Sequence, residues 1–276
     1  MTVATLRQLL DAAEAGRYAV AGLVVLGWED ALAFVEAAEE ARLPVILQAG
    51  PGCRRHTPVP VLGRMFRHLA EQARVPVACH IDHATTLEEC VSGIDHGFTS
   101  VMIDGSSLPL AQNIALTRKV VEAAEMAGVS VEGEVGFVGY SGGRPSAFTA
   151  PADAALFAGE TNVDALAVSV GNVHLQTDAH GKVDRDALHA IEAVTRVPLV
   201  LHGGSGLPPD LRRSLSRKHR IRKFNIGTEL RQAFGASLRG WLVDHPESFD
   251  RIEILRSTIP ALRNAAREVM INLGPG

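Results

Sequence analysis

The sequence predicts an α/β protein whose strands close into a (β/α)8 barrel, the TIM-barrel architecture. Short apolar runs alternate with longer segments of helical period, and eight such strand–helix units fit within 276 residues. The strand segments are apolar throughout, which is typical of a parallel sheet covered by helices on its outer face. A doubly wound open sheet is the competing arrangement, but no glycine-rich dinucleotide fingerprint follows the first strand.

The elements follow one another with little between them, so one domain spanning residues 1–276 is the simplest organisation. Proline opens three strands, at Pro44, Pro76 and Pro198, where it ends the preceding helix and is tolerated as a first strand residue. The expected strands are 19–25, 44–49, 75–80, 99–104, 129–135, 164–170, 198–202 and 222–226. The expected helices are 4–15, 29–42, 60–73, 86–96, 111–127, 151–160, 184–195, 208–219, 228–244 and 257–272.

Composition argues against several kinds of partner. The net charge is −4 and no long run of one sign occurs, so neither nucleic acid nor a membrane surface is expected to bind. No apolar run approaches the roughly 18–20 residues of a membrane span, and the first ten residues resemble an amphipathic helix more than a signal peptide. Three unpatterned cysteines, Cys53, Cys79 and Cys90, indicate a reducing cytoplasm and no disulfide framework.

Polar residues gather where the predicted strands end, and this end of a barrel carries the active site. The third strand ends in His80-Ile-Asp82-His83, while the sixth and seventh strands lead to His174 and His202. Imidazoles from three strand ends would suit Zn²⁺, or another divalent ion, with a position left open for substrate. Such an ion would act as a Lewis acid on a carbonyl or an enediolate.

Acidic residues accompany these histidines. Asp82 could exchange a proton with a substrate hydroxyl, or it could instead orient a neighbouring imidazole. The fourth strand ends at Asp104, the fifth carries Glu132 and Glu134, and the eighth carries Asn225. The expected rim therefore combines metal ligands with proton-transfer groups.

Two glycine-containing loops predict a phosphate site. His202-Gly-Gly-Ser-Gly206 follows the seventh strand and Asn225-Ile-Gly-Thr228 follows the eighth, each leading toward a helix. The loops at these two positions are the usual phosphate site of a barrel, because backbone N–H groups and helix starts attract anions. Residues 54–56, Arg-Arg-His, add positive charge after the second strand; a solvated loop is favoured there over contact with a second anionic group.

Covalent catalysis through a Schiff base is not expected, because it needs a lysine at the rim. Lys119, Lys182 and Lys218 fall in predicted helices or loops. Lys223 lies near the start of the eighth strand, toward the opposite end of the barrel.

Several segments resemble the class II, metal-dependent fructose/tagatose-bisphosphate aldolases. The resemblance extends from about residue 18 to residue 265, and the motifs are specific when taken together. They are His80-Ile-Asp-His83, Gly97-Phe-Thr-Ser-Val-Met-Ile-Asp-Gly-Ser106, Val131-Glu-Gly-Glu-Val-Gly136, Gly171-Asn-Val-His174, His202-Gly-Gly-Ser-Gly206 and Lys223-Phe-Asn-Ile-Gly-Thr228.

The resemblance implies a TIM barrel with a zinc ion on His83, His174 and His202, and Asp82 as the proton donor or acceptor at the aldol hydroxyl. It implies a homodimer or homotetramer, a monovalent cation such as Na⁺ or K⁺ near the phosphate, and a phosphorylated sugar as substrate. Arg256 resembles an arginine that reaches a neighbouring subunit's second phosphate, although an ordinary surface arginine fits equally well. The residues expected around dihydroxyacetone phosphate are Gln48, Gly203, Gly204, Ser205, Asn225, Gly227 and Thr228.

Four positions depart from the family pattern. The first strand usually ends in Phe-Asn or Val-Asn, where this sequence has Val24, and the second usually ends in Ser or Thr, where it has Gly50. The loop after the fifth strand usually contains Gly-Gly-x-Glu-Asp, and one of its acids removes a proton from dihydroxyacetone phosphate. Here the loop is Gly139-Tyr-Ser-Gly-Gly-Arg144 and has no carboxylate, so Glu134, Tyr140 and Ser141 are the candidates to replace it. The glycine that usually follows the second zinc histidine is Leu175.

The expected function is a zinc-dependent lyase that acts on a ketose phosphate or bisphosphate, with dihydroxyacetone phosphate as product or donor. The expected catalytic residues are Asp82, Glu134 and Asn225. The departures leave two alternatives open. The same metal site could run an epimerisation, an isomerisation or an aldol step on a non-standard acceptor, or the chain could be a non-catalytic phosphosugar-binding homologue.

Overall fold

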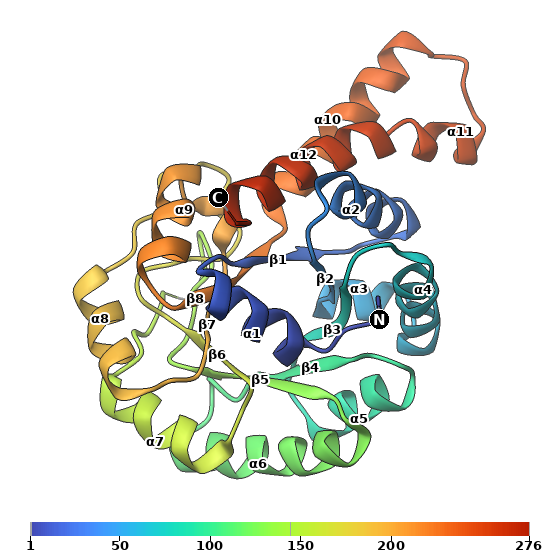
Figure 1. The fold of residues 1–276 in the computed structure, drawn as a ribbon. Helices are drawn as coiled ribbons and strands as arrows, with labels where there is room; N and C mark the ends of the chain where they lie inside the picture. The colour runs from blue at the N-terminus through green and yellow to red at the C-terminus, as the bar shows by residue number, and fades with distance from the viewer. Residues whose placement is uncertain (1, 144, 276) are drawn as a thin grey trace.

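The computed structural model describes residues 2–143 and 145–275, and its strands form a closed parallel barrel (Figure 1). Each strand pairs with the next in sequence, and the last pairs with the first. The predicted (β/α)8 barrel is therefore confirmed. The strands are β1 (Val20–Val24), β2 (Val45–Ala49), β3 (Val77–Ala84), β4 (Ser100–Ile103), β5 (Ser130–Val135), β6 (Ala165–Val168), β7 (Leu199–Leu201) and β8 (Ile221–Ile226).

Helices surround the barrel, and most of them fall where the helical period of the sequence predicts. Two short helices, α3 and α11, are additional, as is a 3-10 turn at Gly204–Gly206. The helices are α1 (Leu6–Gly16), α2 (Trp28–Ala41), α3 (Pro51–His56), α4 (Val59–Gln72), α5 (Leu87–Asp95), α6 (Leu110–Ala127), α7 (Pro151–Thr161), α8 (Arg185–Val194), α9 (Pro209–Lys218), α10 (Thr228–Asp244), α11 (Arg251–Arg256) and α12 (Ile259–Leu273). Within the described ranges, none of these helices has the length and apolarity needed to cross a membrane.

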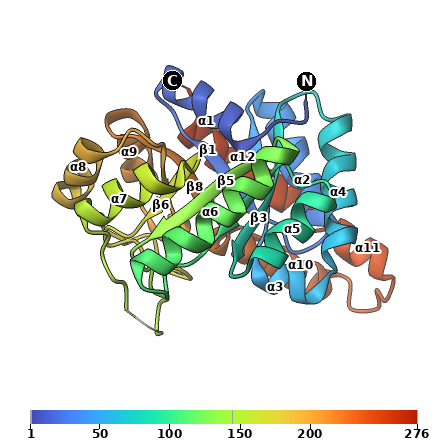
Figure 2. The ribbon, with the colours of Figure 1, turned by 90° about the horizontal axis from the view of Figure 1, so that it is seen from below.

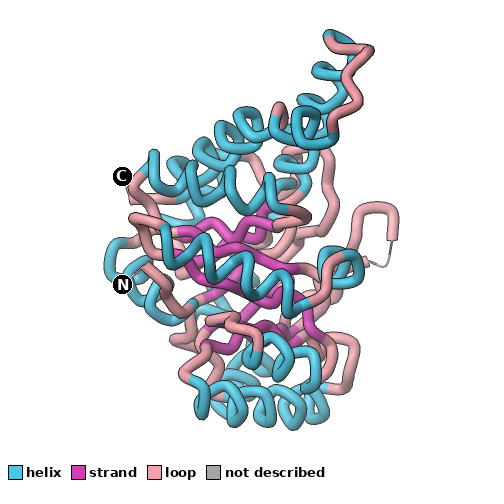
Figure 3. Tube along the Cα trace, turned by 90° about the vertical axis from the view of Figure 1, so that its right-hand side faces the viewer, coloured by secondary structure: helices cyan, strands magenta, loops and turns pink. Residues whose placement is uncertain are grey.

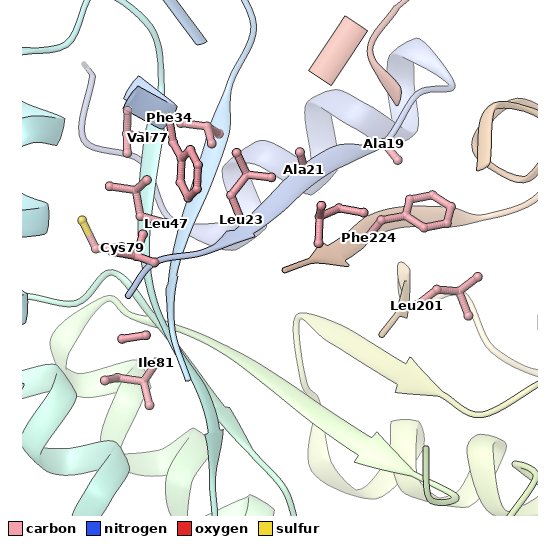
Figure 4. Packing of buried hydrophobic residues seen from close by; sticks show 14 of the residues in the cluster. Ala19, Ala21, Leu23, Phe34, Leu47, Val77, Cys79, Ile81, Leu201 and Phe224 are labelled. Carbon is pink, nitrogen blue, oxygen red and sulfur yellow. The ribbon is translucent and has the colours of Figure 1, made fainter. Parts of the chain in front are cut away.

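Strand side chains alternate between an outer and an inner core. Outward-facing residues such as Leu23, Leu47 and Phe224 belong to the outer core beneath the helices (Figure 4). Inward-facing residues such as Ile46 and Met102 form a smaller core with α1, which crosses one end of the barrel (Figure 2). The apolar end closed by α1 lies opposite the rim where the strands end.

Above this apolar plug the barrel interior becomes polar. Gln48, His80, Glu132 and Lys223 are all fully buried there. The barrel accommodates their bulk partly through Gly22, since a Cβ at that position would lie 1.7 Å from the Gln48 Oε1 atom and 3.1 Å from the Lys223 Cε atom. This polar layer separates the apolar plug from the rim.

The C-terminal part of the chain extends beyond the barrel. The distal part of α10, α11 and the start of α12 form an arm that projects from the barrel wall (Figures 1 and 3). Val243, Phe249 and Ile252 on this arm are exposed. The rest of α12 returns to the barrel and packs against α2.

Candidate metal centre

A β-bulge positions the first functional residues. β3 and β4 are in register at Ile81 and again at Ala84, but the two residues between, Asp82 and His83, oppose only one residue of β4. Neighbouring residues of a regular strand point to opposite faces, whereas a bulge re-aims a side chain. His83 accordingly has a left-handed backbone, with φ of 51°, and both Asp82 and His83 line the same cavity.

The structure brings His83, His174 and His202 together at the rim. Their ring centroids are 5.3 Å (His83–His174), 4.6 Å (His83–His202) and 5.5 Å (His174–His202) apart. Each offers one ring nitrogen, and these nitrogens lie within 4.8 Å of one another. The Nε2 atom of His83 and the Nδ1 atom of His202 are buried without a hydrogen-bond partner. Converging, unpartnered imidazole nitrogens fit a divalent metal ion.

Carboxylates select which nitrogen is free in two of the three rings. The Nδ1 atom of His83 lies 2.8 Å from Asp104 Oδ2, and the Nε2 atom of His202 lies 3.0 Å from Glu132 Oε1. A carboxylate accepts a hydrogen bond from the ring N–H and so leaves the other nitrogen of a neutral imidazole with its lone pair. The free nitrogens are then the two that lack partners.

Burial and neighbouring charge set the protonation of this site. Burial, followed by the charge of His83, lowers the pKa of His202 well below its ordinary value and lowers the pKa of His174 to about 4. Both rings therefore have a lone pair available at neutral pH. Burial alone would lower the pKa of His83 too, but Asp82 and Asp104 raise it to about 10, so a divalent ion would have to displace a proton to bind His83 Nε2.

Glu134 lies beside the histidines, not at the cavity wall. Its Oε2 atom has no hydrogen-bond partner and lies 3.8 Å from His83 Nδ1 and 3.7 Å from His202 Nδ1. Burial and the charge of Asp104 raise its pKa to about 8. Glu134 does not line the cavity in this structure, and its role as a base stays a prediction.

A cavity of about 390 Å³ opens above the histidines, which is large enough for a small phosphorylated sugar. Asn225 Nδ2 donates a hydrogen bond of 3.0 Å to Asp82 Oδ1 and so orients this carboxylate. Burial would raise the pKa of Asp82, but His83 and His202 lower it below its ordinary value. Asp82 is thus an ionised carboxylate at the cavity wall.

The two glycine-containing loops meet at the other side of the cavity. Ser205 Oγ accepts a hydrogen bond of 3.1 Å from the Gly227 N–H, which ties the β7 loop to the start of α10. Gly203 has φ of 67°, and a Cβ there would lie 2.1 Å from the Val173 carbonyl oxygen, so this position requires glycine. Gly203, Ser205 and Gly227 line the cavity together with Thr228.

Three residues expected beside substrate do not line the cavity. Gln48 faces inward at the level of His80, one layer below the rim, and Gly50 lines the cavity in its place. Gly204 is buried within the 3-10 turn. Arg256 is exposed on α11, in the projecting arm, so it cannot serve the cavity of its own chain in this conformation.

The expectation of a solvated loop at residues 54–56 is wrong, because these residues belong to α3. The buried side chain of Arg54 donates hydrogen bonds to the carbonyl oxygens of Asp82 at 2.5 Å and His83 at 3.1 Å. Arg55 lines the cavity. The Gly50-Pro51 pair was an available signal, since proline is favoured at the first position of a helix.

The loop after β5 lies against the metal centre. The Tyr140 ring stacks on His174 with centroids 4.9 Å apart and an interplanar angle of 24°, and Tyr140 lines the cavity. The Ser141 N–H donates to the His174 carbonyl oxygen at 2.9 Å. Tyr140 therefore occupies a place from which it can contact substrate, while Arg144 of this loop lies outside the described residues.

One further group with metal-ligand chemistry, His83, Asp104 and Glu134, shares His83 with the rim triad. Another, His189, Glu192 and His219, joins α8 to the end of α9. Its carboxylate is already engaged, since Glu192 accepts hydrogen bonds from the His219 ring at 3.1 Å and from the Arg220 backbone N–H. These hydrogen bonds connect α8 to the end of α9, so the cluster has a structural role without a metal ion. The rim triad, with its free nitrogens, is the better metal centre.

A closed parallel barrel with three converging histidines and an ionised aspartate at its C-terminal rim defines a metal-dependent barrel enzyme. The family model described as fructose-bisphosphate aldolase class-II matches residues 4–275. The chain belongs to this family and is therefore a metal-dependent aldehyde-lyase.

Two solved structures show the same fold. The YdjI aldolase from Escherichia coli K12 is 29% identical, with a TM-score of 0.85 over 99% of this chain and 98% of that chain. Fructose-bisphosphate aldolase (Fba) from Campylobacter jejuni is 22% identical, with a TM-score of 0.81 over 98% of this chain and 95% of that chain.

Proposed function

We propose that the chain is a zinc-dependent aldolase that makes or breaks a C–C bond in a ketose phosphate or bisphosphate, with dihydroxyacetone phosphate as product or donor. The observation that carries this proposal is the convergence of three histidine nitrogens and Asp82 on one cavity. Three imidazoles with an open position suit Zn²⁺. The ion supplies positive charge that stabilises negative charge on a substrate oxygen.

Asp82 is the proton acceptor in the cleavage direction. It takes the proton of the substrate hydroxyl next to the scissile bond, the C–C bond breaks, and an aldehyde leaves. The bond's electrons pass into the enediolate of the three-carbon fragment, and a proton from the Tyr140 phenol or from solvent, added at carbon, gives dihydroxyacetone phosphate. In the synthetic direction Asp82 returns the proton. Asn225 supports both directions because its Nδ2 atom holds the Asp82 carboxylate in place.

The loops after β7 and β8 bind the phosphate. The backbone around Gly203 and Gly227 and the start of α10 at Thr228 provide N–H groups and a helix dipole for an anion. A monovalent cation, Na⁺ or K⁺, near this phosphate belongs to the same proposal. Arg55, on the α3 side of the cavity, would contact a second anionic group at the far end of the substrate.

The proposed enzyme is a cytoplasmic homodimer or homotetramer. The projecting arm carries exposed apolar side chains, among them Phe249 and Ile252, and it also carries Arg256. In such an assembly Arg256 of one subunit would approach the cavity of its neighbour. This arrangement would give Arg256 the substrate contact that its position in its own chain rules out.

One observation favours a second candidate function. The loop facing the metal centre has no carboxylate in residues 139–143, and Tyr140 is its cavity-lining side chain. Burial and nearby carboxylates raise the pKa of Tyr140, so it stays a neutral phenol that can donate a proton. A site built this way could instead run an epimerisation, an isomerisation or an aldol step on a non-standard acceptor.

The test uses purified, zinc-loaded protein with a panel of ketose 1-phosphates and bisphosphates. We expect release of dihydroxyacetone phosphate, detected by a coupled dehydrogenase, from at least one of them. Asp82→Asn should lower kcat by about 10²–10⁴-fold, since a positioned base contributes that much, with the zinc content unchanged. Lys182→Ala, a change in a loop residue outside the cavity lining, is the control.

Proton exchange at the substrate carbon separates the two candidates. If no ketose phosphate releases an aldehyde but deuterium from solvent enters the substrate, the divergent reaction replaces the aldolase. Neither cleavage nor exchange with any member of the panel would contradict both candidates.

A further inference from the structure

The barrel interior holds a buried ion pair that the proposed chemistry does not use. Lys223 Nζ lies 2.6 Å from Glu132 Oε2, and both side chains are 0% exposed. Lys223 is on β8 and Glu132 on β5, with β6 and β7 between them in the barrel, so the lysine reaches across the interior. Lys223 lies near the start of β8, as the sequence predicts, and its side chain points into the interior.

This ion pair is joined to the metal centre through one ring. The second carboxylate oxygen of Glu132, Oε1, lies 3.0 Å from His202 Nε2. The Nδ1 atom on the other side of that ring is one of the unpartnered nitrogens of the triad. Lys223, Glu132 and His202 thus form a chain that begins at a buried ammonium and ends at a metal-ligand atom.

Stability alone is a weak reason for burying these two charges. Removing an ion pair from water costs several times what an exposed pair gains, and apolar replacements of similar shape are often as stable or more so. Lys223 also needs room that an apolar wall would not require, since its stem passes over Gly22. The arrangement therefore points to a role in specifying the geometry of the site.

We propose that Glu132 and Lys223 are positioning residues for the metal centre. Lys223 holds one oxygen of Glu132, so the other oxygen is fixed as the acceptor for His202 Nε2–H. The imidazole is then held in the tautomer and orientation that present Nδ1 to the ion. This inference rests on the proposed metal site and does not depend on which reaction the site performs.

Three variants and one control test the inference. Glu132→Gln keeps the shape but replaces a pure acceptor by an amide that can also donate. Lys223→Met keeps the length of the stem and removes the ammonium. The third variant combines the two changes. The control is Thr161→Val, which removes a buried hydroxyl on α7 that donates a 2.6 Å bond to the Phe157 carbonyl oxygen and bonds to neither Glu132 nor His202.

The primary measurement is zinc affinity, from competition with a chromophoric chelator, together with the visible spectrum of the Co²⁺-loaded protein. We expect each single variant to bind zinc 10–100-fold more weakly, as is usual when the partner of a ligating histidine is lost, and to show an altered Co²⁺ spectrum. The double variant should lose no more than Glu132→Gln alone, because Lys223 acts through Glu132. Thr161→Val should match the wild type.

Wild-type zinc affinity and an unchanged Co²⁺ spectrum in both single variants would overturn the inference, as would independent, multiplying losses in the double variant. Circular dichroism of the metal-free proteins identifies variants that do not fold. For those, Glu132→Asp keeps the charge and shortens its reach, so the same loss of affinity is expected and its absence counts against the inference. Because these readouts need no substrate, a failure of the aldolase assay leaves them interpretable.

Discussion

Two residues of the metal centre have a left-handed backbone that only glycine adopts freely. His83 has φ of 51° and Leu175, which directly follows His174, has φ of 58°. For an L-residue this conformation costs roughly 1–2 kcal/mol. At His83 the left-handed backbone belongs to the bulge of β3. The bulge turns the His83 side chain toward the cavity, beside Asp82. Leu175 stands where the resembling family usually has glycine, and its φ supplies the physical reason for that preference.

Leu175→Gly should therefore be more stable than Leu175→Ala. Leu175 is 47% exposed, so both variants lose the burial of about half a leucine side chain, but only Leu175→Gly removes the left-handed strain. Added freedom in the unfolded chain offsets about 0.4–1 kcal/mol, which leaves an expected gain over Leu175→Ala of up to about 1 kcal/mol in the free energy of unfolding. Urea denaturation of the two variants measures it. A Leu175→Gly protein less stable than Leu175→Ala would contradict this account.

Helix α3 places two neighbouring arginines in opposite environments. The Arg54 side chain is only 6% exposed, and it joins the ends of β2 and β3 through the carbonyl oxygens of Ala49, Asp82 and His83. Arg55 is exposed at the cavity and has no hydrogen bond or ion pair recorded among the described residues. The first arginine is therefore structural, while the second is available to substrate.

The two alanine variants should separate these roles. Arg54→Ala leaves backbone carbonyls unsatisfied and should lower the free energy of unfolding by about 2 kcal/mol or more, since bonds to charged groups contribute about 1.5–3 kcal/mol. Arg55→Ala should leave Tm unchanged and raise KM for a bisphosphate more than for a monophosphate. An equal rise in KM for the two substrates in Arg55→Ala would contradict the proposed contact between Arg55 and a second anionic group.

The pattern of the sequence predicted the strands and most helices because each has enough residues to show its period. The short helices α3 and α11 were missed, since six residues give less than two turns of a pattern. The bulge at Asp82 and His83 was also missed. The residue types around Asp82 and His83 are compatible both with a strand that ends there and with a strand that continues to Ala84 through a bulge.

At the scale of the whole molecule the barrel is organised in three levels. An apolar plug with α1 closes one end, a polar layer with Glu132 and Lys223 lies above it, and the metal centre with its cavity opens at the other end. The apolar end can thus support stability while the opposite rim carries chemistry, as is general in this fold.

The closed barrel also explains which parts of the site were predictable. His83, His174 and His202 were predicted as a group because parallel strands end on a common rim. The ion pair of Lys223 with Glu132 was not, because it depends on which inward-facing side chains are long enough to meet across the interior. Tyr140 was considered only as a replacement for a missing acid, and its stacking on His174 depends on how two loops pack.

The central claim is that the three rim histidines bind one divalent ion, and anomalous diffraction from zinc-soaked crystals measured on both sides of the zinc edge tests it most directly. We expect a single strong peak about 2.0–2.1 Å from His83 Nε2, His202 Nδ1 and one ring nitrogen of His174, the usual Zn–N distance. A peak confined to His189, Glu192 and His219, or none within bonding distance of the rim nitrogens, would contradict the account.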